Sequence, residues 1–200
     1  MKGCLGRIFK FLAALVIAVL LYHFGVIDFV KNKISEYNSG KEERIIENTR
    51  DIVDLSNIDE EYKINKNLNF MKNRMITAEH KATGQKMIMV ESAKGDLLTK
   101  EDIKGEGLSE KIDNLISKSK NNVLKFDKPE IIKKGEFFGI NQTIPYARFK
   151  AGVSNLPFKE IEGIIGVAEV NNGENLIIIS YNQNEKYSQI ITDAFYGRVK

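Results

Sequence analysis

Hydrophobic residues are most concentrated near the start of the chain. Residues 11–27 (FLAALVIAVLLYHFGVI) form an uncharged run that follows Lys2, Arg7 and Lys10. A hydrocarbon core is about 30 Å thick and a helix rises about 1.5 Å per residue, so about twenty residues are needed to cross it. The run reaches this length with its apolar neighbours. The pattern predicts a short cytoplasmic segment at residues 1–10 and a transmembrane helix over residues 11–30.

The alternatives are a signal peptide removed on export and a helix lying on the membrane surface. A cleavable signal has about 7 to 15 apolar residues followed by a small-x-small site. This run is longer, and it ends in Tyr22, His23, Phe24 and Gly25 without such a pair. We therefore expect a retained signal anchor in the lipid bilayer of the cell membrane. The cations before the run favour a single-pass protein with a cytoplasmic N-terminus and an extracytoplasmic globular domain.

Residues 31–61 have the pattern of a connector. Asn38, Ser39 and Gly40 precede a charged stretch, KEERIIENTRDIVDL, which predicts a helix over residues 41–55. Its apolar residues form one narrow stripe at helical spacing: Ile45, Ile46, Ile52, Val53 and Leu55. A stalk helix packed on its own domain is favoured over a coiled-coil or docking helix, because there are too few heptads for a coiled coil.

Residues 62–200 have the pattern of one α/β domain. Strand-like residues 74–80 and 85–91 flank a turn at residues 82–84, which predicts a β-hairpin. Thr99 and Asp102 have the spacing of a capping box, and the glycines that follow stop this helix early. An amphipathic helix then begins near Ser109.

The rest of the domain is mostly strand. Short β-like runs lie at residues 123–126, 130–133, 137–140 and 145–151, with Pro129, Gly135 and Asn141 between them. Residues 163–170 and 174–181 are joined through Asn-Gly, the strongest short hairpin signal. The chain closes with a predicted helix whose apolar face would hold Tyr187, Ile190, Ile191, Ala194 and Phe195.

Two continuous apolar runs determine the expected layers. Residues 164–168 and 176–179 do not alternate with polar residues, as a strand with one wet face should. Both faces of these strands should therefore be covered, with one helix available on each side. The expected fold is α+β, an N-terminal transmembrane helix followed by a three-layer α/β/α sandwich with a mainly antiparallel sheet.

This order of elements resembles the PsbP-like fold over about residues 62–200. The strand YARFK at residues 146–150, the hairpin at Asn172 and Gly173, and the helix ending near Phe195 carry the resemblance. The resemblance implies a non-enzymatic accessory or assembly module, often beside a membrane complex. Members of that group are often exported by a cleaved peptide or a lipid anchor, so the retained helix expected here argues against a photosynthetic role.

Charge excludes one class of function. The chain has 30 Lys and Arg against 27 Asp and Glu, which gives a net charge of +3. Dedicated nucleic-acid binders usually show a strong basic bias. We expect no nucleic-acid partner.

Residue types that serve catalysis and metal binding are scarce, since the chain has two histidines and one cysteine. His23 is interpreted as an interfacial residue and His80 as a surface turn residue, because no second histidine or cysteine completes a metal site. Four methionines surround the first hairpin: Met71, Met75, Met87 and Met89. Thioethers suit Cu(I), but the last two share a strand face, as core packing also requires. We expect no catalytic residue, cofactor or metal.

The candidate functional residues form a surface for a protein partner at the membrane. Tyr146, Arg148 and Lys150 alternate along one strand and should share a face. Lys125, Lys133 and Lys134 belong to a basic cluster, which also fits a solvated strand edge protected by lysines.

The expected function is a single-pass membrane-anchored, non-enzymatic binding or assembly module of an envelope or membrane complex. The alternative is a membrane-anchored hydrolase or transferase that uses carboxylates such as Asp96, Glu101 and Asp102.

Overall fold

The computed structural model describes most of the predicted domain. It covers residues 49–70, 73–92, 97–117, 125–126, 129–154, 160–170, 173–182 and 186–200. The predicted transmembrane helix at residues 11–30 lies outside this part of the chain. Within the described residues, no helix combines the length and the apolar character that a membrane crossing requires.

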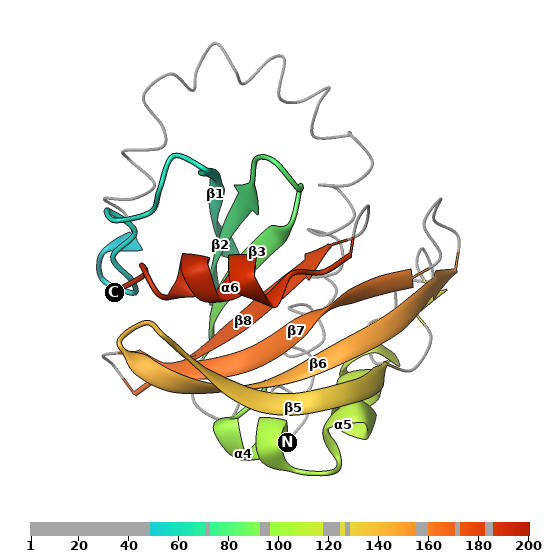
Figure 1. Cartoon of the computed structure of the whole chain (residues 1–200). Helices are drawn as coiled ribbons and strands as arrows, with labels where there is room; N and C mark the ends of the chain where they lie inside the picture. The colour runs from blue at the N-terminus through green and yellow to red at the C-terminus, as the bar shows by residue number, and fades with distance from the viewer. Residues whose placement is uncertain are drawn as a thin grey trace.

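An eight-stranded antiparallel sheet forms the body of the domain (Figure 1). Its strands are β1 (Tyr62–Phe70), β2 (Asn73–His80), β3 (Lys86–Ser92), β4 (Lys125–Phe126), β5 (Glu130–Gly139), β6 (Gln142–Ser154), β7 (Glu160–Glu169) and β8 (Asn175–Asn182). The helices are α4 (Lys100–Lys104), α5 (Leu108–Ser117) and α6 (Gln189–Tyr196). The predicted antiparallel α+β class is confirmed.

The last strand, β8, lies near the middle of the sheet. The strand order is β1-β2-β3-β8-β7-β6-β4, and β5 also pairs with β6. The predicted hairpins β2–β3 and β7–β8 are both present. All residues of β3 and β8 are buried, as expected for strands with a layer on each face.

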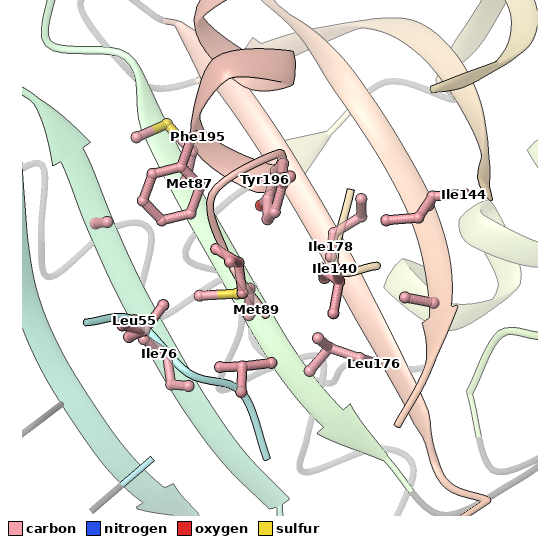
Figure 2. Packing of buried hydrophobic residues seen from close by; sticks show 14 of the residues in the cluster. Leu55, Ile76, Met87, Met89, Ile140, Ile144, Leu176, Ile178, Phe195 and Tyr196 are labelled. Atoms are coloured by element: carbon pink, nitrogen blue, oxygen red, sulfur yellow. The ribbon is translucent and has the colours of Figure 1, made fainter. Parts of the chain in front are cut away.

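Helices cover the two faces of the sheet (Figure 1). One core, which includes Met89, Ile178, Phe195 and Tyr196, lies between the sheet and α6 (Figure 2). The second core, which includes Ile103 of α4 and Leu108 of α5, lies on the opposite face. The apolar face predicted for the last helix was partly wrong.

The exposed fractions of its side chains show which face of α6 is buried. Ile190 is 80% exposed, whereas Phe195 is fully buried. Ala194 is also exposed, while Thr192 is buried in the polar end of the core. A hydroxyl occupies a core position here because it forms hydrogen bonds, which the apolar periodicity does not reveal.

The predicted break at Gly135 is absent, and β5 is one strand that pairs with β6 on both sides of this glycine. A side chain at position 135 would be blocked, since a Cβ atom there would lie 2.9 Å from the ring of Tyr146. The glycine therefore makes room for an aromatic ring across the strands, as in other sheets. The β5–β6 turn lies at Ile140 and Asn141, which have φ angles of 52° and 54°.

Residues 49–61 pack against the domain that was predicted to begin at residue 62. Ile52, Val53 and Leu55 are buried in the α6-side core. Of the helix predicted over residues 41–55, the structure describes only residues 49–55. Residues 50–52 form a turn and residues 53–55 are irregular, so this end of the predicted segment is not helical. The amide of Asp54 donates to the carbonyl of Lys200 at 2.5 Å, and the Asp54 carbonyl accepts from the Lys200 amide at 3.1 Å. These backbone bonds replace the helical ones and join the segment to the C-terminus.

Candidate interaction surface

The structure separates the six residues that the sequence grouped as a surface. Arg148, Lys150 and Lys133 lie on the α6 side of the sheet, since Lys133 pairs with Arg148 across β5 and β6. Lys134 lies on the opposite face. For Lys125 only the backbone in β4 is described.

Tyr146 is only 8% exposed and belongs to the α6-side core. Its ring lies 5.9 Å from the ring of Phe137. The alternation that puts Tyr146 on the same face as Arg148 is correct, but α6 and β5 cover this end of the strand. Tyr146 therefore offers little surface to a partner.

Arg148 is held in place by two different contacts. Its guanidinium binds the Glu162 carboxylate of β7, with Nη2 and Nε at 2.5 and 2.7 Å from Oε1. The same guanidinium lies 5.4 Å from the ring centre of Tyr187, a cation–π contact. Both contacts fix the orientation of the guanidinium. Arg148 is therefore an ordered cation, and 28% of its side chain is exposed.

Tyr187 is a rigid support for this cation. Its hydroxyl is within 2.9 Å of Thr192 Oγ1 and donates to Gln189 at 3.1 Å. Burial raises the pKa of Tyr187, so the phenol stays neutral under physiological conditions. Sequence reasoning missed this residue because it treated the aromatic as part of the apolar helix face.

A regular charge pattern continues along β6 and β7. Lys150 Nζ lies 3.2 Å from Glu160 Oε1. In the ladder, Lys150 is opposite Glu162 on β7 and Glu130 on β5, so the signs alternate across the sheet. We call Lys133, Arg148, Lys150, Glu160 and Glu162 the charged face. Their pairing was not predictable, because it depends on the β6–β7 register.

Lys134 has a structural role on the opposite face. Its Nζ donates to the carbonyl of Gly105 and, at 3.1 Å, to that of Lys104. A cation at the last carbonyls of a helix is favoured by the helix dipole. Lys134 therefore caps the end of α4.

A second ionic cluster, which the sequence did not indicate, ties residues 49–61 to the sheet. Arg74 donates to both oxygens of Glu91, at 2.7 and 3.1 Å, and to Asp51 at 2.5 Å. Glu174 hydrogen-bonds to Glu91, and this contact, with burial, raises the pKa of Glu174. The cluster stabilises the contact of residue 51 with β2 and β3.

His80 is more enclosed than the predicted surface turn residue. Its Nδ1 lies 3.0 Å from Thr83 Oγ1, and its ring packs at 5.2 Å against Tyr62. These contacts hold the β2–β3 turn. The part of the chain that the structure describes contains no group of three or more acidic, histidine or cysteine side chains suited to a metal.

The methionines divide between the two cores. Met87 and Met89 lie in the α6-side core, and Met75 lies in the other. The prediction of core packing for Met87 and Met89 is confirmed. Met71 lies outside the described residues.

The carboxylates named for the enzyme alternative have different surroundings. Asp102 accepts from the Thr99 amide and hydroxyl, at 2.8 and 2.9 Å, and from Lys111 Nζ at 2.5 Å. This confirms the predicted capping box. Glu101 is exposed, and Asp96 lies outside the described residues. Asp102 is therefore engaged as a helix cap.

Replacing Asp102 by Asn should cost about 1 kcal/mol of stability at neutral pH. Burial alone would raise the pKa of Asp102, but hydrogen bonds from Lys111 and Thr99 outweigh it and lower the pKa. The carboxylate thus stabilises the fold above the unfolded-state pKa, and this contribution is lost as pH falls through the lower folded-state pKa. Urea unfolding at several pH values measures the difference. Glu101→Gln, one residue away, is the control and should change little.

Comparisons with known proteins give a fold resemblance only. No protein-family model matches the chain, and no curated protein matches it in sequence. Among solved structures, the chain is similar to the solution structure of cyanobacterial PsbP (CyanoP) from Synechocystis sp. PCC 6803, with 9% sequence identity and a TM-score of 0.43. The match covers 70% of this chain and 82% of that one. The predicted resemblance to the PsbP-like fold is thus found among solved structures.

Proposed function

We propose that this chain is a single-pass membrane-anchored, non-enzymatic module that binds a protein partner outside the cytoplasm. The N-terminal apolar run would anchor it, and the charged face would meet the partner. The observation that carries the proposal is the fixed geometry of Arg148 between Glu162 and Tyr187.

An ordered cation favours recognition over simple solvation. A free surface arginine loses side-chain entropy when it binds, whereas Arg148 is already restrained by β7 and Tyr187. Glu160, which is 57% exposed, and Lys150, which is 41% exposed, continue the pattern beside it. Alternating charges of this kind select a partner with the complementary pattern and oppose others.

The attachment of residues 49–61 to the domain supports a position near the membrane. Residues 31–48 separate this segment from the predicted span, and a fully extended chain of that length reaches at most about 65 Å. The domain would therefore stay within that distance of the bilayer. A partner that meets the charged face would belong to the same membrane or lie close to it.

Site-specific photo-crosslinking in native membranes tests the proposal. The full chain, carrying a photo-reactive residue in place of Lys150, should resist alkaline carbonate extraction and capture a defined protein. Adding Arg148→Ala to this chain should reduce the capture several-fold, because the neighbouring cation is lost.

A probe in place of Lys63 provides the matched control, because Lys63 is an exposed lysine of β1 away from the charged face. Equal capture by both probes, or capture that survives Arg148→Ala, would contradict a specific surface. Release of the chain by carbonate would contradict the anchor.

A further inference from the structure

The strand β5 has one edge that the described part of the chain leaves unpaired. Within the described residues it pairs with β6 only, and β4 pairs with β6 farther along, at Val153 and Ser154. Of the three large hydrophobic side chains that are exposed in this part of the chain, two belong to β5: Ile132 is 44% exposed and Phe138 is 66% exposed. An edge of this length with exposed apolar residues is a site for pairing with another strand.

The backbone groups of alternate residues point outward from this edge. The two-residue turn makes Gly139 and Gln142 the first hydrogen-bonded pair of the β5–β6 ladder. Hydrogen-bonded and non-hydrogen-bonded pairs then alternate, so Glu136 lies in a pair without bonds to β6. Its partner is Pro145, which has no amide proton to donate and therefore suits a pair without hydrogen bonds. Lys134, Glu136 and Phe138 therefore direct their N–H and C=O groups away from β6.

These outward residues are self-complementary in one antiparallel register. With Gly135 opposite Gly135 of a second copy, each Lys134 faces a Glu136, and the exposed Phe138 lies opposite the β-bulge between Ile131 and Lys133. Opposite charges at facing positions stabilise a sheet. The bare backbone at Gly135 allows close approach at the symmetry axis.

Two neighbouring registers would also let the outward N–H and C=O groups of the two copies pair, but each of them brings like charges together. A shift in one direction places Lys134 against the second copy's Lys134, and a shift in the other direction places Glu136 against Glu136. Like charges directly opposite each other destabilise a strand pair. A lysine on its own discourages pairing at a strand edge. Here, however, Glu136 lies at the position related to Lys134 by the two-fold axis, so the lysine meets an opposite charge.

We propose that β5 is a dimer interface, at which a second copy of this chain pairs antiparallel about Gly135. The two sheets would form one continuous sheet, related by a two-fold axis perpendicular to its surface. The interface is isologous, so the same residues contribute from both copies.

Charge reversal at two positions gives a decisive test. Lys134→Glu makes both side chains of each facing pair acidic, and Glu136→Lys makes both of them basic. Each variant alone should therefore dimerise at least about tenfold more weakly than the wild type. An equal mixture of the two variants restores opposite charges at both facing pairs and should form heterodimers as readily as the wild type forms homodimers. Sedimentation of the full chain in detergent over a range of concentrations measures this.

Two checks separate the interface from folding and from association of the anchors. Lys134 and Glu136 also contact α4, so circular dichroism must show that each variant is folded. Lys186→Glu reverses an exposed charge outside the strand and should leave the dimer unchanged. A misfolded chain or a dimer held by the anchors would not lose dimerisation in each single variant and recover it in the mixture.

Three outcomes would overturn the proposal. They are a wild-type chain that is monomeric at every concentration, single variants that associate as tightly as the wild type, and a mixture that does not recover association. The first outcome would leave the β5 edge to a strand from a different protein.

Discussion

Phe195→Ala should destabilise the domain by about 3 to 5 kcal/mol, a large part of the roughly 5 to 15 kcal/mol that usually holds a domain together. The Phe195 side chain is fully buried between α6 and the sheet (Figure 2). Its ring lies 5.1 Å from both Tyr62 and Tyr196, so truncation opens a cavity lined by aromatic rings. Urea unfolding of residues 31–200, followed by circular dichroism, measures the change.

Ile190→Ala is the matched control for this substitution. Ile190 lies on the same helix but is 80% exposed, so its loss should change the unfolding free energy by no more than about 0.5 kcal/mol. Similar effects of the two substitutions would contradict the packing of α6 on the sheet.

A chain that begins at Tyr62 should fail to unfold cooperatively, whereas one that begins at Lys41 should fold. The shorter chain lacks Ile52, Val53 and Leu55, which are at most 4% exposed. Losing one large buried aliphatic residue typically costs about 2 to 5 kcal/mol, so losing three approaches the whole stability of a domain. Thermal melting of the two fragments gives the comparison.

Leu55→Ala tests the same contact without shortening the chain. It should cost about 2 to 5 kcal/mol, while Ser56→Ala at the adjacent exposed residue should cost little. Cooperative melting of the shorter fragment near the temperature of the longer one would show that residues 49–61 are dispensable.

Local chemistry explains which elements were predictable. The turn at Gly84 and the turn at Gly173 require φ angles of 69° and 70°, which glycine adopts readily. The capping box at Thr99 and Asp102 is likewise a contact between near neighbours. Features of this kind are encoded within a few residues and can be recognised in a single sequence.

Contacts between distant residues explain what was missed. Gly135 indicates a break when it is considered alone, and only the ring of Tyr146 above it shows why the strand continues. Asp54 leaves the helical pattern because its backbone partner is Lys200, which is distant in the sequence. The strand β1 was missed because its pairing with β2 outweighs a polar, asparagine-rich sequence.

The same limit applies to the candidate surface. Alternation places Arg148 and Lys150 on one face, because it depends only on strand geometry. It does not show that Tyr146 lies under neighbouring elements, nor that Glu162 and Tyr187 hold Arg148. Both facts depend on the register of β7 and on the position of the loop before α6.

The central position of β8 sets the order of events during biosynthesis. Proteins are made from the N-terminus, and β8, which joins the β1–β3 part of the sheet to the β5–β7 part, follows all of these strands in the chain. The two parts cannot be joined until β8 has left the ribosome. The bonds between Lys200 and Asp54 form later still. A nascent chain that has been made as far as β7 therefore carries two open strand edges, β3 and β7, which stay accessible to chaperones until β8 emerges.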